Sequence, residues 1–590
     1  MSRYRQFLIV ILISGLLLGL TGRLFWLQSR TVAESLLSER GLAYQAVRQR
    51  RAEVLLDDGR GRIVDRTGQP LVGYPMQALL VKSALAAEDT EELLQVLDIE
   101  RRQWQTFLDE TRLPALWRRS GEHQPMGLTA QQAERLHRLS QHEVKVVPYL
   151  QRYLEQPLAA QLIGYIGENP ELIMQQYKHQ IVDQQIGYNQ QIGVSGLERS
   201  FDRFLQAVDP ISWGIYQDGR SQSVYGLEDR LIHSDNAFYP LTLHTTIDRE
   251  LQKRIEALLS RYQIQAAGIV VLAANSGDIL AMANLPVFDP NQVLPERGLW
   301  RNLTVSAYAP GSVFKTVVAA AALEAGLTHP GEQFQCDGVW HEHHLRCVNR
   351  SGHGRLTLEQ AYAQSCNLTF AQLAVRVGPE RLEATAAKLG MGQQVGWSRH
   401  KLQTPIGIVE RFRQLDAEQP GQIFDAAANR MDQGALARTG IGQQDVRMTP
   451  LQAARLNAII INGGYAVTPR IVSEVLTEHR QVYLTFPLEE RRERLLSGRT
   501  AAWLANAMRL TAQAGTARVL STVTGGAGGK TGTAEEGSGS ERYVHQWFTG
   551  FAPAQAPKYT FTVLVPRRAP NSRHLATTIA QELVQLLGEE

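Results

Sequence analysis

The sequence has little cysteine, no strong excess of charge of either sign, and no long apolar run beyond its N-terminal segment. Three cysteines in 590 residues are too few for a disulfide-stabilised scaffold. A net charge of +3 gives no sign of the basic face that nucleic-acid-binding proteins present, so no nucleic-acid partner is expected. A mean hydropathy of −0.22 excludes a multi-pass membrane protein. We therefore expect a large, mostly soluble chain with several domains.

The N-terminal segment is apolar enough to cross a membrane. Residues 7–27 contain a single charge, Arg23, and an arginine near the end of a span can reach the headgroups. A cleavable signal peptide is the alternative, but no small-x-small cleavage site precedes Arg30. Arg3 and Arg5 favour a cytoplasmic tail at residues 1–6 and an extracytoplasmic remainder on the cytoplasmic membrane.

Local patterns divide the rest of the chain into regions 28–240 and 241–590. Thr31–Glu53 is rich in helix-forming residues and predicts a helix. In the second region, the apolar patterns predict strands at 268–273, 279–282 and 559–565, and an amphipathic helix at 575–587. Sheet and helix at both ends of this region indicate an α+β domain.

Three short motifs follow one another in the second region. They are Ser312-Val-Phe-Lys315, Ser365-Cys-Asn367 and Lys530-Thr-Gly-Thr533. Each motif alone is weak evidence, because such short patterns occur by chance. Together and in this order they are the signature of the penicillin-recognising serine enzymes.

The chemistry of acyl transfer accounts for the residue types. Pro310-Gly311 predicts a sharp entry to a helix that carries the nucleophile Ser312 near its N-terminus, where negative charge is favoured. Lys315 lies one turn further on. To act as a base it must be neutral, so its pKa must fall from about 10.4 to roughly 7–8, helped by burial and by the charge of Lys530.

The other two motifs have complementary roles. Ser365 is predicted to pass a proton to the departing amine, and Asn367 to bind a substrate amide. Thr531, Gly532 and Thr533 are expected on an edge strand that binds the substrate backbone and its terminal carboxylate. The backbone N–H groups of Ser312 and Thr533 would then form the oxyanion hole.

With these residues, the chain resembles a class B penicillin-binding protein, a membrane-anchored D,D-transpeptidase of the bacterial cell wall. Residues 60–66 and 193–198 are similar to motifs of the non-catalytic pedestal of that class. Similar motifs of its transpeptidase domain occur at 245–252, 308–315, 440–443, 448–452 and 547–553.

The resemblance implies an architecture and a reaction. The anchor would be followed by an extended, dimerisation-like pedestal at 28–240 and by a serine β-lactamase-like transpeptidase domain at 241–590, with a five-stranded antiparallel sheet flanked by helices. The D-Ala-D-Ala end of a peptidoglycan stem peptide would acylate Ser312, and a neighbouring amine would accept the acyl group. β-Lactams would be inhibitors.

The sequences of Gly352-His-Gly354 and of residues 192–198 resemble those of the elongation-type subgroup, which maintains rod shape. This implies a RodA-type glycosyltransferase and an MreC-type scaffold as partners. A division-specific relative is the alternative. Less favoured alternatives are a membrane-anchored β-lactamase or D,D-carboxypeptidase, a β-lactam sensor, and a binding scaffold. A β-lactamase would need a base for deacylation, for which Glu535 and Glu536 are the nearby carboxylates.

The three cysteines are close together in the sequence, with a histidine among them: Cys336, Cys347, His353 and Cys366. One interpretation is a Cys336–Cys347 disulfide with Cys366 buried as a small apolar side chain. The other is a structural zinc site with three cysteines and one histidine. Some elongation-type relatives look metal-bound at the positions of His353 and Cys366, which supports zinc. Glu332 or Asp337 could replace a ligand. No organic cofactor is expected.

Overall fold

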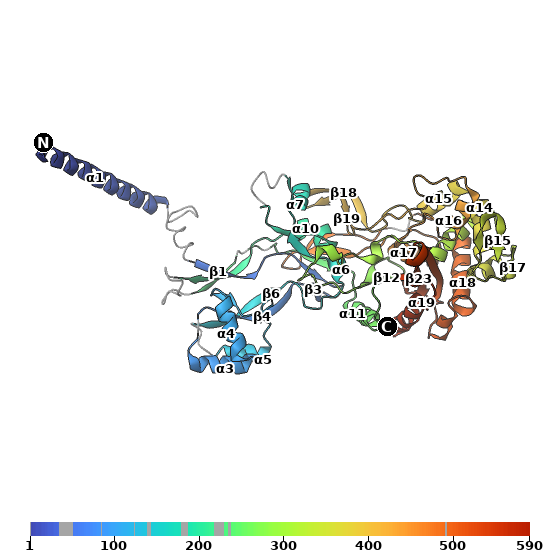
Figure 1. Ribbon diagram of the computed structural model, residues 1–590, viewed down its shortest axis with the longest axis horizontal. Coiled ribbons are helices and arrows are strands. Elements are labelled where there is room, and N and C mark those ends of the chain that lie inside the picture. Colours follow the sequence, from blue (N-terminus) through green and yellow to red (C-terminus); the bar gives the residue numbers. More distant parts are fainter. Residues whose placement is uncertain are drawn as a thin grey trace. The chain divides into compact units, whose positions relative to one another are not determined.

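The structure is a computed structural model that describes residues 2–34, 51–83, 85–122, 124–138, 143–178, 187–217, 229–233, 236, 238–489 and 493–589 (Figure 1). The chain forms two compact units that interleave along the sequence. The first comprises Met1–Gly59, Pro75–Gln151 and Ala207–Asn236, and the second comprises Arg60–Tyr74, Arg152–Gln206 and Ala237–Glu590. A single domain boundary at residue 240 stays a prediction from sequence.

The N-terminal helix α1 (Ser2–Glu34) contains the predicted apolar segment. Its residues Phe7–Trp26 are long and apolar enough to cross a membrane, which is consistent with a single-pass anchor. The helix predicted for Thr31–Glu53 is wrong at its end, because Arg51–Glu53 belong to strand β1 (Arg51–Asp57); residues 35–50 lie outside the described part. Pairing of β1 with β9 (Ile211–Tyr216) outweighs the local helix propensity.

Where the structure describes it, the first unit contains two small sheets and, besides α1, three short helices. One sheet has the order β1-β9-β10 and the other β5-β4-β6. Trp104, Phe107 and Trp117 pack together in its helical part, where the rings of Phe107 and Trp117 meet edge to face and the ring of Trp104 is tilted against both. The remaining elements of this unit are β4 (Tyr74–Val81, whose first residue belongs to the second unit), α3 (Ala87–Leu97), α4 (Arg101–Glu110), β5 (Ala115–Leu116), α5 (Ala130–Leu136), β6 (Val144–Gln151) and β10 (Arg230–Ile232).

The second unit is built on a five-stranded sheet, in which every neighbouring pair of strands is antiparallel. Its order is β13-β12-β24-β23-β22, so β22 is an edge strand. The strands are β12 (Ala267–Ala273), β13 (Ile279–Leu285), β22 (Gly528–Glu536), β23 (Tyr543–Ala552) and β24 (Tyr559–Arg568). The predicted α+β fold with a five-stranded antiparallel sheet is confirmed, and three of these strands lie where the apolar patterns placed them.

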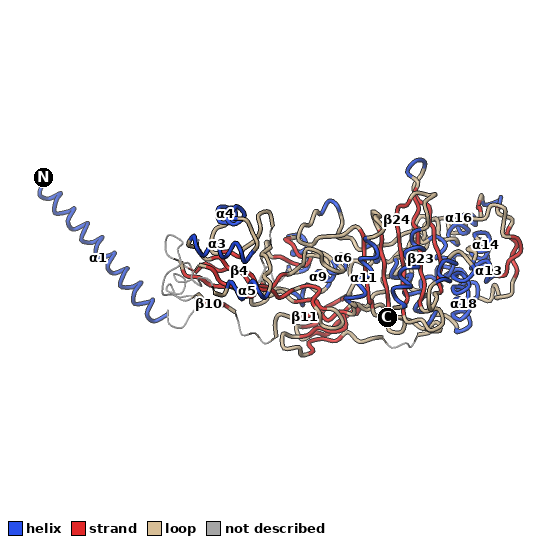
Figure 2. Tube along the Cα trace, turned by 90° about the horizontal axis from the view of Figure 1, so that it is seen from below, coloured by secondary structure: helices blue, strands red, loops and turns tan. Residues whose placement is uncertain are grey.

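Helices cover both faces of this sheet, as the view in Figure 2 shows around β23 and β24. On one face, α11 (Arg249–Ser260) and the predicted helix α19 (Leu575–Gly588) pack on Ile269, Val271 and Phe561. On the other, α12 (Lys315–Glu324), α17 (Pro450–Ile461) and α18 (Gly498–Ala514) surround Trp547, Phe551 and Leu564. Alternate strand residues thus enter different cores.

A second, mixed sheet in this unit has the order β21-β20-β11-β2-β3. Strand β2 (Arg62–Val64), from one of the pedestal-like motifs, lies parallel to β11 (Thr242–Thr245). Strands β3 (Pro70–Val72), β20 (Val472–Leu476) and β21 (Val482–Thr485) complete it. The motif at 60–66 is therefore part of the same compact unit as the catalytic motifs.

The other elements of the second unit are short. They are α6 (Ala160–Ile163), β7 (Ile166–Glu168), α7 (Pro170–Gln176), β8 (Gln191–Gly193), α9 (Gly196–Ser200), α10 (Asp202–Leu205), β14 (Gln333–Cys336), β15 (Val339–Trp340), β16 (Leu345–Arg346), β17 (Gly354–Thr357), α13 (Leu358–Ala363), α14 (Asn367–Val377), α15 (Pro379–Lys388), β18 (Ser398–Thr404), β19 (Gly407–Arg413) and α16 (Gln433–Gly440).

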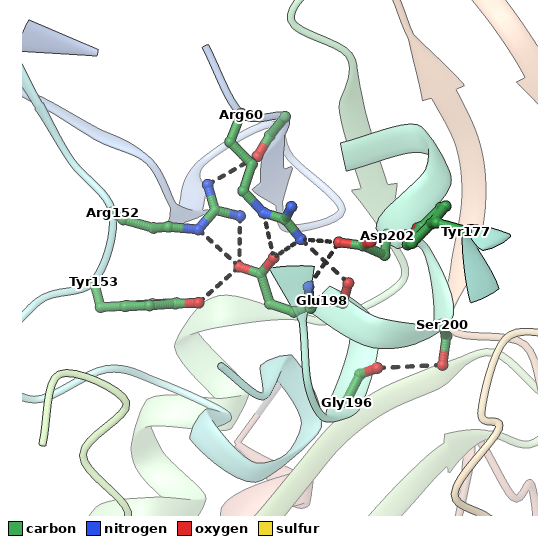
Figure 3. Close-up of polar contacts among 10 residues, drawn as sticks. Arg60, Arg152, Tyr153, Tyr177, Gly196, Glu198, Ser200 and Asp202 are labelled. Atoms are coloured by element: carbon green, nitrogen blue, oxygen red, sulfur yellow. Dashed lines mark hydrogen bonds and ion pairs between the residues drawn. The ribbon is translucent and has the colours of Figure 1, made fainter. Parts of the chain in front are cut away.

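A buried charge network joins both pedestal-like motifs within the second unit (Figure 3). Arg60 donates to the carboxylates of Glu198 (2.9 Å) and Asp202 (2.7 Å), and Arg152 donates to the other oxygen of Glu198. Tyr153 also donates to Glu198 (2.9 Å). Burial alone would raise the pKa of Glu198, but the charges of Arg152 and Arg60 outweigh burial and lower it.

Candidate active site

Ser312 lies on a tight turn that is pressed against the edge strand β22. The 3₁₀ turn η3 (Gly311–Phe314) leads directly into α12. Gly311 has a φ of +53°, and a Cβ at this position would lie 2.3 Å from the carbonyl oxygen of Thr533. The position therefore requires glycine. The predicted sharp entry to a helix is found, with a 3₁₀ turn as its first part.

Lys315 is fully buried and is held by the second motif. Its Nζ donates to the carbonyl oxygen of Ser365 (2.7 Å), to the Ser365 hydroxyl (3.2 Å) and to Oδ1 of Asn367 (2.7 Å). Within the described residues, no hydrogen bond joins Lys315 to the Ser312 hydroxyl. Such contacts commonly form only when substrate is bound.

Ser365 occupies a strained turn between α13 and α14. It has a φ of +56°, which is rare for a residue other than glycine and is typical of functional sites. Its N–H donates to the carbonyl of Tyr362 (3.0 Å), and the N–H of Cys366 donates to that of Ala361 (2.8 Å). The turn directs the hydroxyl and the carbonyl of Ser365 toward Lys315.

Lys530 brings the third motif to the same hydroxyl. This fully buried lysine lies on β22 and donates from Nζ to Oγ of Ser365 (2.9 Å) and to the carbonyl of Thr531 (2.9 Å). The Ser365 oxygen thus accepts hydrogen bonds from two lysines, and its own proton is left to donate to a third group. The three motifs meet at this oxygen.

Two adjacent buried ammonium groups cannot both be charged without a large cost. Burial lowers the pKa of Lys315 to about 8. Burial, and then the charge of Lys315, lower the pKa of Lys530 well below its usual range. Lys530 is therefore the first of the two to lose its proton, and a pKa of about 8 lets a fraction of Lys315 be neutral near neutral pH, as the chemistry of a lysine base requires.

The rest of the third motif lies on the free edge of the sheet. Thr533 is exposed, while the Thr531 hydroxyl is hydrogen-bonded to that of Thr516 (2.7 Å). A Cβ at Gly532 would lie 2.5 Å from the carbonyl oxygen of Pro310. Gly532 is thus needed for contact with the nucleophile turn, a reason that differs from the predicted close approach of substrate.

Both the oxygen and the nitrogen of the Asn367 side-chain amide form hydrogen bonds. Its oxygen accepts from Lys315, and its nitrogen donates to the carbonyl of Arg346 (3.0 Å). An amide nitrogen carries two protons, so one is still available for a substrate carbonyl. The predicted role in binding a substrate amide stays a prediction.

The four predicted metal ligands lie together, with one donor atom from each within 4.8 Å of every other: Cys336, Cys347, His353 and Cys366. Nδ1 of His353 is 3.5 Å from Sγ of Cys336 and 3.4 Å from Sγ of Cys347, and the sulfurs of Cys347 and Cys366 are 3.9 Å apart. All three cysteines are free thiols.

The alternative carboxylate ligands have other partners. Glu332 accepts from Arg376 (2.7 Å) and Thr328 (2.7 Å), and Asp337 accepts from Gln335 (2.6 Å). Neither belongs to the group of four. The donor set is therefore three thiols and one imidazole.

Two residues at the site have no role assigned from sequence. The hydroxyl of Tyr362 is hydrogen-bonded to that of Thr316 (2.8 Å), and Nζ of Lys530 lies 5.8 Å from the centre of its ring. Gln443 contacts the backbone of β22 at Thr533 or Glu535. Tyr362 had no signal in a single sequence, whereas Gln443 lies in the motif at 440–443.

Comparison with known families matches both regions of the chain. Residues 267–585 match the penicillin-binding protein transpeptidase domain, and residues 57–215 match the penicillin-binding protein dimerisation domain. These matches confirm the resemblance drawn from the motifs.

Individual relatives carry related names. The peptidoglycan D,D-transpeptidase PbpA of Mycolicibacterium smegmatis is 30% identical over 326 residues, which are 50% of this chain and 61% of PbpA. The peptidoglycan D,D-transpeptidase MrdA of Haemophilus influenzae is 26% identical over 479 residues, 73% of this chain and 69% of MrdA. Stage V sporulation protein D of Bacillus subtilis is 28% identical over 387 residues, 63% of this chain and 56% of that protein.

The chain thus spans about three fifths of the length of some of these relatives, among them PbpA. The transpeptidase match alone covers more than half of the chain. It includes the nucleophile turn, the strained serine and the edge-strand lysine that meet at Ser365. The chain belongs to the penicillin-binding protein transpeptidase family.

Proposed function

We propose that this chain is a serine D,D-transpeptidase that cross-links peptidoglycan stem peptides through an acyl-enzyme at Ser312. The observation that carries the proposal is the meeting of two buried lysines on the Ser365 hydroxyl, next to the turn that bears Ser312. The names of the relatives PbpA and MrdA, both peptidoglycan D,D-transpeptidases, support it.

In the first step, neutral Lys315 takes the proton of the Ser312 hydroxyl. The oxygen attacks the carbonyl carbon of the penultimate D-alanine, and the N–H groups of Ser312 and Thr533 bind the resulting oxyanion. The amide bond then breaks, the departing D-alanine amine receives the proton from Lys315 through Ser365, and an ester to Ser312 remains.

In the second step, an amine of a neighbouring stem peptide attacks the ester carbon. It loses a proton to the same lysine–serine pair, the new amide bond forms, and the Ser312 oxygen leaves with that proton. Water in place of the amine would give carboxypeptidase hydrolysis from the same ester.

The geometry gives no support to a β-lactamase. The carboxylate of Glu536 is 3.0 Å from Nε2 of His545 and forms an ion pair with Arg447 at 3.1 Å. A carboxylate held in this way is not positioned as a free base for a deacylating water. Glu535 contacts Gln443 through its backbone.

Labelling with a fluorescent penicillin tests the proposal. We expect a stable adduct on the full chain, no adduct on Ser312→Ala, and normal labelling of Ser521→Ala, an exposed control whose hydroxyl donates to the carbonyl of Arg518. Transfer from a D-Ala-D-Ala donor to a D-amino acid acceptor would then establish transpeptidation. Labelling that persists in Ser312→Ala, or rapid loss of the adduct, would contradict the proposal.

We also propose that Cys336, Cys347, His353 and Cys366 hold one structural zinc ion. A tetrahedral site with Zn–S of about 2.3 Å and Zn–N of about 2.0 Å has donor separations of about 3.5–3.8 Å. Three of the donor pairs are 3.4–3.9 Å apart, and all four donors lie within 4.8 Å of one another. The N–H of Asn367 donates to Sγ of Cys347, and the Thr369 hydroxyl donates to Sγ of Cys366 (both 3.4 Å), as second-layer groups do around metal thiolates.

When bound, such an ion supplies a cross-link and no step of the reaction. Because Cys366 lies between Ser365 and Asn367, the cross-link would fix the strained turn that carries both residues. Elemental analysis of full chain purified without chelator should give about one zinc per chain, and Cys366→Ser should lose zinc and melt at a lower temperature. An absence of metal, or a Cys336–Cys347 disulfide found by mass spectrometry, would contradict the site.

Finally, we propose an elongation role with RodA-type and MreC-type partners, and a cytoplasmic N-terminus. The sequences of residues 192–198 and of the Gly352–Gly354 turn support the elongation role. Arg3 and Arg5, which precede the apolar segment, support the cytoplasmic N-terminus. Depletion of this protein from a rod-shaped host should produce round cells. Filaments would instead indicate the division-specific alternative.

A further inference from the structure

The side chain of Gln443 covers part of the outer edge of β22. In an antiparallel sheet, the backbone groups of an edge strand point alternately toward its partner strand and outward. Gln443 reaches both the N–H and the carbonyl of Glu535, so the backbone groups of Glu535 point outward. The period of two then places those of Thr533 and Thr531 in the same direction. These are the groups that an added strand would pair with.

Gln443 pairs with Glu535 much as a strand residue would. With the amide oriented to satisfy both groups, its nitrogen donates to the carbonyl of Glu535 (3.3 Å) and its oxygen accepts from the N–H of Glu535 (3.2 Å). In the opposite orientation, its nitrogen lies 3.5 Å from the carbonyl of Thr533. In either orientation the amide lies on the outer edge of β22, directly beyond the residue proposed for the oxyanion hole.

The turn that carries Gln443 is fixed to the nucleophile turn. Gly442 has a φ of +73°, and a Cβ there would lie 1.9 Å from the carbonyl oxygen of Gly311. The N–H of Gly311 donates to the carbonyl of Gly442 (3.0 Å), and the N–H of Gln443 donates to that of Arg438 (3.1 Å). The position of the Gln443 amide is therefore set relative to Ser312.

We infer that Gln443 is a specificity-determining residue that limits how much of the donor peptide pairs with β22. The inference rests on the proposed transpeptidase function. If the penultimate D-alanine pairs with Thr533, antiparallel alternation brings the residue two places before it to Glu535. That position is taken by Gln443. Backbone recognition of the donor thus ends at the penultimate residue. A longer donor forms no further backbone hydrogen bonds with the edge of β22.

The test compares two donors, acetyl-D-Ala-D-Ala and acetyl-Ala-Ala-Lys-D-Ala-D-Ala. The full chain is the enzyme, and the measurement is the rate at which it releases the terminal D-alanine of each donor. Gln443→Ala frees the Glu535 edge, so kcat/KM for the long donor should rise about threefold to tenfold relative to the short one, the range expected for one or two backbone hydrogen bonds. Penicillin is expected to pair with β22 no further along than Thr533. The rate at which it acylates Gln443→Ala should therefore stay within twofold of the rate for the unmodified chain.

Gln444→Ala is the matched control, because the side chain of this exposed neighbour accepts a hydrogen bond from Arg438 and makes no hydrogen bond to β22 among the described residues. It should leave the ratio of the two donors unchanged. An unchanged ratio in Gln443→Ala, or an equal change for both donors and penicillin, would overturn the inference. Failure of the unmodified chain to react with penicillin or either donor would instead overturn the proposed function.

Hydrogen exchange provides a readout that does not depend on the stability of the variant. In the unmodified chain without ligand, the Glu535 amide should be protected more than tenfold relative to an exposed edge, because Gln443 accepts from it. Adding the short donor should not change this protection. Exchange at the rate of a free edge would show that Gln443 does not occupy it.

Discussion

At the scale of single residues, Glu418 is a carboxyl group in surroundings that disfavour its charge. It is 3% exposed, and the N–H groups of Val395 and Gly396 donate to it, both at 2.9 Å. Burial outweighs these hydrogen bonds and raises its pKa from 4.5 to about 7. A raised carboxyl pKa contributes stability that is complete below pH 4.5 and is lost as the pH rises from 4.5 to about 7.

We therefore predict that Glu418→Gln gains stability relative to the unmodified chain as the pH rises. The shift corresponds to about 3 kcal/mol between pH 4 and pH 8.5. Melting temperatures measured across this range should show the variant gaining mainly between pH 4.5 and 7. The exposed Glu410→Gln is the control and should show no such trend. A constant difference at every pH would contradict the prediction.

The identity of the catalytic residues could be predicted from sequence, but their arrangement could not. The three motifs carry their residue types in the chain itself, whereas the left-handed backbone of Ser365 and the bond from Lys530 to its hydroxyl depend on tertiary contacts. The same holds for Tyr362 and Gln443, whose partners come from distant segments. A single sequence gives no signal for such pairs.

At the scale of elements, apolar strands with clear ends were the most predictable. The hairpin of β12 and β13, strand β24 and helix α19 lie where the pattern placed them, because their residues are buried over most of their length. The end of the helix predicted for Thr31–Glu53 was wrong, since Arg51–Glu53 have side chains that suit a helix but pair with β9. Nothing local in the sequence predicts that β2 pairs with β11.

The contact of the η3 turn with β22 supports a prediction at this scale. Gly311→Ala should lower penicillin acylation at least 100-fold, because its Cβ would overlap the Thr533 carbonyl at 2.3 Å and push the turn away from the edge. Gly326→Ala is the matched control, since Gly326 has a φ of +66° with nothing within 4 Å of its Cβ. It should cost stability of about 1 kcal/mol but not reactivity. Equal acylation of the two variants would refute the steric explanation.

At the scale of the whole molecule, the buried charge network lies where chain segments enter the second unit. Arg60 and Arg152 are each the first residue of such a segment, and both donate to Glu198. Removing one partner of a buried pair leaves an uncompensated charge, which costs about 3–5 kcal/mol. The network therefore joins segments that are far apart in sequence.

We predict that Arg60→Met and Glu198→Gln each destabilise the chain by about 3–5 kcal/mol, and that the double variant loses less than the sum. Denaturant unfolding measures the three values. Arg138→Met, which removes an exposed pair with Glu134, should change stability by less than about 1 kcal/mol. Additive losses in the double variant would show that Arg60 and Glu198 act independently.

The order of strands in the catalytic sheet has a consequence for how the chain folds. Strand β24 lies between β12 and β23, yet it is made near the end of the chain, whereas β12 is made near the start of the transpeptidase region. Until β24 emerges, β12 has an open edge and its apolar face lacks α19. Such non-local pairing slows folding and exposes aggregation-prone edges. A chain that is still unfolded must therefore be kept from aggregating until its last strand has been made.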